Sequence, residues 1–212
     1  MLTMEQARAL GAHLAAQHGA TILHPDDVVP HAVLVALDIA DDYLPALAPI
    51  TEALLARLEH VSVTLPTPAG TVILLSRAAC ADPLSYARTV THECVHAAQI
   101  AERGGPGIVV DYALSQSLRA ANEGNGYGAG LAMHWLLTGE VLDESGPVAS
   151  LSTDTYLLDA AAILLGGGIV SVHVDTMRAG MLPNLSTLVT AYRWLRAHAP
   201  EALRVTLARE PG

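Results

Sequence analysis

Five consecutive residues, His92-Glu93-Cys94-Val95-His96, constrain this chain more than any other feature of its sequence. Residues four apart lie one turn apart on the same face of an α-helix, so a helix here presents two imidazoles side by side. This H-E-x-x-H spacing suits two ligands of one zinc ion, and the glutamate between them lies about 100° further around the helix. A carboxylate there can act as general base on a zinc-activated water. The pentapeptide therefore predicts a zinc-dependent hydrolase.

The flanking residues predict that the motif lies in the middle of a long helix, from about Pro83 to Arg103. Asp82 followed by Pro83 is typical of an N-cap and a first-turn proline. At the other end, Arg103 and the Gly104-Gly105 pair supply a cation and a helix stop. The motif is therefore in register with both ends of the predicted helix.

This helix is predicted to have two distinct faces. Small and apolar residues recur at three- and four-residue steps and form a predicted buried stripe, Ala87, Val90, Cys94, Ala97 and Ala101. Both motif histidines lie on the opposite, polar stripe and are expected to point away from the core. Cys94 is interpreted as a small core residue and not as a ligand or nucleophile.

From Thr91 to Gln99 the sequence resembles the zincin metallopeptidases, specifically their gluzincin branch. The resemblance covers about residues 61–137 and is specific only at the motif. It implies that His92 and His96 bind zinc, that Glu93 is the general base, and that a glutamate on a following helix is the third ligand. It also implies that an extended peptide substrate pairs with a strand beside the cleft.

A zinc site needs at least a third protein ligand, and a catalytic site leaves the fourth position to water. The metzincin extension would require Gly at position 99 and His or Asp at position 102, whereas this chain has Gln99 and Glu102. The ligand is therefore expected from a separate element. Glu123 is the preferred candidate, ahead of Asp111 and His134.

Glu123 lies in a predicted second helix that follows the Gly104–Gly107 turn and continues from about Val109 to about Leu137. Small and site-forming residues share one face of it, namely Ala120, Glu123, Gly124, Tyr127, Gly130 and His134. Such a face would let the two helices approach closely. Glycine is costly inside a helix, and residues 124, 126, 128 and 130 are all glycine. The alternative is therefore a glycine-rich loop in which Glu123 is solvated.

Further polar side chains are candidates for supporting roles. Gln99 or Thr89 could form hydrogen bonds with the ligating imidazoles. A different group could polarise the scissile carbonyl or stabilise its oxyanion. The candidates for that role are Tyr112, Tyr127, His134 and His173. Ordinary packing is the competing interpretation for each of them.

Composition excludes several classes of protein. The formal net charge of −10 argues against a nucleic-acid partner, and the apolar fraction of 51% excludes disorder. Two cysteines do not make a disulfide framework. No signal peptide is recognisable, and the apolar stretch at 160–172 is shorter than the roughly 18 to 20 residues that a membrane span requires. A cytoplasmic protein without a membrane partner is expected.

Three parts are expected along the chain: an N-terminal helical part (1–60), a core with the metal site (61–138) and a C-terminal helical part (139–212), all in one domain. In the core, residues 61–65 and 71–76 predict a β-hairpin around a proline-rich turn. The other expected helices are 3–18, 27–40, 50–59, 155–178 and 185–198. The expected fold is α+β, mostly helical, with a small sheet beside the motif helix.

These observations together favour a zinc metallopeptidase that acts on a peptide or protein, with Zn²⁺ as its cofactor and Glu93 as its general base. One alternative is a non-catalytic, zincin-like binding or structural module of a larger assembly. Another is an accidental motif on a solvated helix, which predicts that the two histidines face bulk solvent with no carboxylate nearby.

Overall fold

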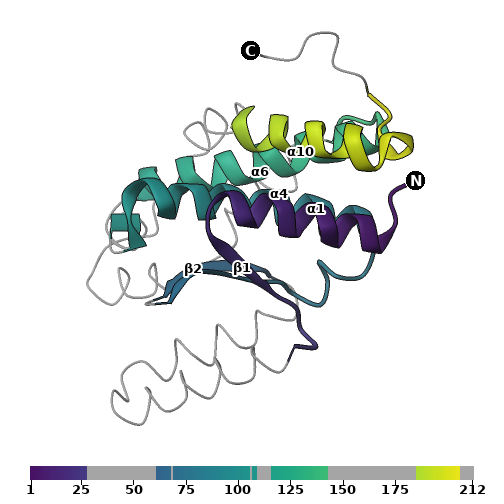
Figure 1. The fold of residues 1–212 in the computed structure, drawn as a ribbon. Helices are drawn as coiled ribbons and strands as arrows, with labels where there is room; N and C mark the ends of the chain where they lie inside the picture. Colours follow the sequence, from purple (N-terminus) through teal and green to yellow (C-terminus); the bar gives the residue numbers. More distant parts are fainter. Residues whose placement is uncertain (28–60, 68, 106, 109–115, 143–184, 206–212) are drawn as a thin grey trace.

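The computed structural model describes residues 1–27, 61–67, 69–105, 107–108, 116–142 and 185–205. Within them the elements follow in the order α1 (Met4–Gln17), β1 (Ala20–Leu23), β2 (Val63–Thr67), β3 (Gly70–Leu74), α4 (Pro83–Arg103), α6 (Gln116–Thr138), α10 (Leu185–His198) and a short 3-10 helix, η2 (Pro200–Ala202). The four α-helices lie on one side of the small sheet (Figure 1). The predicted mostly helical α+β fold is thereby confirmed.

The sheet has the order β1-β3-β2. β2 and β3 are antiparallel, with Thr64 opposite Ile73, which confirms the predicted hairpin. β1 pairs with the other side of β3 in parallel, with Ala20 beside Thr71. This third strand was not predicted, because four residues contain too little alternation to distinguish a strand from a loop.

α4 has the predicted bounds, and the residues that cap its two ends explain them. The Oδ1 atom of Asp82 accepts hydrogen bonds from the backbone N–H groups of Leu84 and Ser85, each at 2.9 Å. These two N–H groups have no partner inside the helix, so the N-cap satisfies them. At the far end Gly104 has a φ of +77°, a conformation that disfavours side chains and stops the helix.

One face of α4 lies in the main hydrophobic cluster, which also includes residues of α1, β3, α6 and α10. Four of the five predicted stripe residues are fully buried there, namely Ala87, Val90, Cys94 and Ala97. The prediction for Ala101 was wrong, because this residue is exposed. In the last turn Ile100 is buried instead, and its larger side chain removes more apolar surface from water.

Both predicted terminal helices are present, since α10 has the predicted bounds and α1 follows the N-cap Thr3. The helices predicted at 27–40 (beyond residue 27), at 50–59 and at 155–178 lie outside the described residues, as do residues 109–115 of the predicted second helix. The division at residues 60 and 138 stays a prediction. No helix in the described part of the chain is both long and apolar enough to cross a membrane.

Replacing Asp82 by alanine should lower the free energy of unfolding by about 1 kcal/mol at neutral pH, because a helix cap is lost. Hydrogen bonds from the Ser85 hydroxyl and from backbone N–H groups hold the pKa of Asp82 below its ordinary value of 3.8. The charged cap therefore stabilises the fold fully above that value, and its contribution fades as the pH falls through the lower native pKa.

Urea unfolding at about pH 7 and at about pH 2.5 would measure this difference. Asp82→Asn is the matched control, because its side-chain oxygen can still accept the backbone hydrogen bonds. A destabilisation by alanine that does not shrink in acid would contradict the role of the carboxylate.

Candidate metal site

α4 and α6 pack against each other at two glycines. A Cβ atom added to Gly126 would lie 2.9 Å from Cε1 and Nε2 of His92, and one added to Gly130 would lie 3.3 Å from the carbonyl oxygen of Arg88. The helices therefore run in opposite directions, and a side chain at Gly126 would require the His92 ring to move, whereas one at Gly130 would fit only tightly. Gly126 and Gly130 lie at this helix interface, and the alternative of a glycine-rich loop is wrong because all four glycines are in α6.

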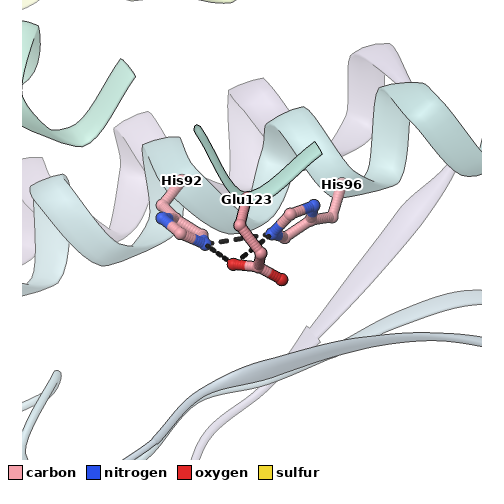
Figure 2. A group of neighbouring side chains, drawn as sticks. All are labelled: His92, His96 and Glu123. Carbon is pink, nitrogen blue, oxygen red and sulfur yellow. Dashed lines mark hydrogen bonds and ion pairs between the residues drawn. The ribbon is translucent and has the colours of Figure 1, made fainter. Parts of the chain in front are cut away.

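Three potential metal ligands converge at the interface. Both imidazoles extend from α4 to the same side, and Glu123 reaches them from α6 (Figure 2). The Nε2 atoms of His92 and His96 are 3.0 Å apart, and Oε2 of Glu123 lies 3.5 Å and 3.6 Å from them. One point lies about 2.0 Å from all three atoms, which matches the lengths of Zn–N and Zn–O bonds. The triad is therefore able to hold a metal ion.

Gln99 determines which nitrogen of His96 faces the other ligands. The Nδ1 atom of His96 lies 2.9 Å from Oε1 of Gln99, whose amide group donates to the carbonyl oxygen of Asn122 at 3.4 Å. Because Oε1 can only accept, Nδ1 bears the proton, and Nε2 of the neutral ring keeps its lone pair for a metal. This is the kind of contact proposed for Gln99 from the sequence.

The charges of the triad are strongly coupled. Burial by itself lowers the pKa of His96, but the Glu123 carboxylate, together with Glu93 and Gln99, raises it to about 9. Burial would raise the pKa of Glu123, yet the charge of His96 and hydrogen bonds from both histidines hold this pKa well below its ordinary value. The Glu123 carboxylate thus favours a positive charge on the neighbouring imidazole of His96.

Glu93 leaves α4 in another direction, toward the sheet. It is only 5% exposed, and its Oε2 atom accepts a hydrogen bond of 2.7 Å from the hydroxyl of Thr64 in β2. Thr64 was missed in the sequence because no motif marks it. Its position in the predicted hairpin was the only available signal.

The remaining candidates are dispersed. The ring of Tyr127 lies edge-on against that of His92, with 4.7 Å between ring centroids, so Tyr127 supports a ligand. His134 is buried three turns beyond Glu123, about 16 Å along α6, and neither of its ring nitrogens has a hydrogen-bond partner among the described residues. His134 is therefore not part of the triad. Three other candidates lie outside the described residues: Asp111, Tyr112 and His173.

Gly126→Ala should weaken zinc binding at least about tenfold, because the added methyl group collides with the His92 ring although alanine is the better helix former. Competition with a chromophoric chelator would measure the affinity, and circular dichroism would verify the helix content. Gly107→Ala is a suitable control, since its Cβ would meet only Arg103 Cβ at an ordinary 3.7 Å. Equal affinities of the wild type and the Gly126 variant would contradict this packing.

Zinc affinity should also increase with pH up to about 9, because zinc must displace the proton that the raised pKa keeps on His96. If one proton is released, the apparent affinity changes by about tenfold per pH unit below that pKa. Isothermal titration calorimetry in buffers of different ionisation enthalpy would count the released protons. An affinity that is constant between about pH 6 and pH 8.5 would disprove this competition.

No family model matches this chain, and comparisons with curated proteins and with solved structures also gave no match.

Proposed function

We propose that this chain is a zinc-dependent hydrolase that cleaves peptide bonds, with the ligand set of a gluzincin. The observation that carries the proposal is the convergence of His92, His96 and Glu123 from two helices, beside a buried Glu93 that is not one of the three ligands. Three protein ligands are typical of catalytic zinc, which keeps its fourth position open.

Two histidines and one carboxylate can also bind Fe²⁺ and other divalent ions. Zinc is preferred here because the histidines lie four apart on one helix with a glutamate between them. When bound, zinc would polarise a carbonyl group and lower the pKa of a water molecule. His92, His96 and Glu123 would hold it, and Gln99 would orient one of the imidazoles.

Glu93 would supply the acid–base chemistry. It would accept the proton of the attacking water and then deliver this proton to the leaving amine nitrogen. Its carboxylate is largely shielded from solvent and is fixed on one oxygen by Thr64. Low solvent exposure and a fixed orientation both suit a carboxylate that accepts a proton from one group and donates it to another.

A peptide or protein substrate fits the position of the sheet. β2 is the last strand in the order β1-β3-β2, and its Thr64 contacts Glu93. An extended peptide could therefore add to β2 through main-chain hydrogen bonds and place an amide bond near this glutamate. The formal charge of −10 disfavours nucleic acid as the substrate.

Glu93→Gln should reduce peptide hydrolysis by at least about a hundredfold while zinc content is retained, because the amide cannot accept a proton. His96→Ala should lose zinc itself. Metal analysis by mass spectrometry and hydrolysis of a peptide library would measure both effects. Glu102→Gln is the matched control, since this exposed glutamate lies in the same helix.

Unchanged hydrolysis in the Glu93 variant would refute its role as the general base. A wild-type protein that holds zinc firmly but cleaves no peptide would favour the non-catalytic binding module instead.

A further inference from the structure

The hydroxyl group of Thr64 contacts Glu93 at two points. It lies 2.7 Å from the carboxylate Oε2 and 3.1 Å from the backbone oxygen of the same residue. The contact with Oε2 is the shorter of the two, so it is the stronger hydrogen bond. The sheet and α4 are thus joined directly at the proposed general base.

This contact makes the two carboxylate oxygens of Glu93 inequivalent. Oε2 is occupied by the Thr64 hydroxyl, whereas Oε1 accepts no hydrogen bond from any residue that the structure describes. A glutamate side chain has three rotatable bonds and would otherwise sample several orientations. Because the Thr64 hydroxyl holds Oε2, Oε1 is the oxygen of Glu93 that is available to accept a proton.

The direction of the Thr64 hydroxyl is itself fixed by the sheet. Threonine is β-branched, so its χ1 angle is restricted in a strand. Thr64 pairs with Ile73 of β3, whose side chain is fully buried in the main hydrophobic cluster. A shift of β2 by one residue would turn the hydroxyl to the other face of the sheet, so the strand register determines the contact.

We propose that Thr64 is the positioning residue of the general base: its hydroxyl holds Oε2 of Glu93, so that Oε1 faces the attacking water. The inference rests on the proposed function as far as catalysis is concerned. The positioning itself is a property of the folded chain and can be measured without turnover.

Thr64→Val removes the hydroxyl at nearly constant shape, and Thr64→Ser keeps it. Losing one positioning hydrogen bond should lower kcat about tenfold in the valine variant, with KM and zinc content unchanged, and serine should restore most of the loss. The control is Thr71→Val, because Thr71 lies in β3, the other strand of the same hairpin, where it pairs with Pro66. Its kcat should stay at the wild-type value.

A valine variant with wild-type kcat would overturn the proposal. So would equal losses in the Thr64 and Thr71 valine variants, since that result would indicate a weakened hairpin. Thermal unfolding of all three variants would show whether the fold survives. If the Thr64 valine variant does not fold, the serine variant decides: a large loss of kcat in it would overturn the proposal, and near wild-type kcat would support it.

Crystal structures of the metal-free wild type and the valine variant separate this inference from the proposed function. A Glu93 carboxylate that leaves its position in the variant supports positioning by Thr64, even if the wild type cleaves no peptide. A carboxylate that keeps its position overturns the inference, even if the wild type proves to be an active hydrolase.

Discussion

The close packing of α6 against α4 is the constraint on which the candidate site depends. A glutamate side chain is short, so Oε2 of Glu123 can lie within 3.6 Å of both imidazole nitrogens only when the helix backbones are close together. Gly126 provides that distance, because any side chain there would overlap the ring of His92. Glycine weakens a helix by about 1 kcal/mol relative to alanine. At Gly126 this cost accompanies the close packing of α6 against His92.

α4 distributes its polar side chains between two neighbours. His92 and His96 face α6, whereas Glu93 turns toward β2, as expected for residues about 100° apart on a helix. The groups that hold a cation and the group that would move protons are thereby anchored to different elements. Each can be perturbed by substitutions that leave the other set in place, which makes the two roles separable by experiment.

The features that local sequence determines were predicted correctly. Asp82 and Gly104 mark the ends of α4, and the hairpin strands follow from alternation around a turn. Glu123 was identified through helical spacing, but a glycine-rich loop remained an alternative. The reason for a glycine at position 126 is its contact with the His92 ring, and this contact between two helices is not visible in the sequence. Thr64 was missed because its partner Glu93 is distant in sequence, and β1 was missed because four residues show too little alternation and the partner strand is distant as well.

The two strand pairings of the sheet differ in how far apart their strands lie in the sequence, and this difference affects the order in which they form. β2 and β3 are only two residues apart along the chain, whereas Ala20 of β1 pairs with Thr71, about fifty residues away. Closing the longer loop costs more chain entropy, so the hairpin is expected to form before β1 docks. The β2–β3 hairpin, which carries Thr64, would then form early, and α4 would pack against it afterwards, bringing Glu93 to the Thr64 hydroxyl.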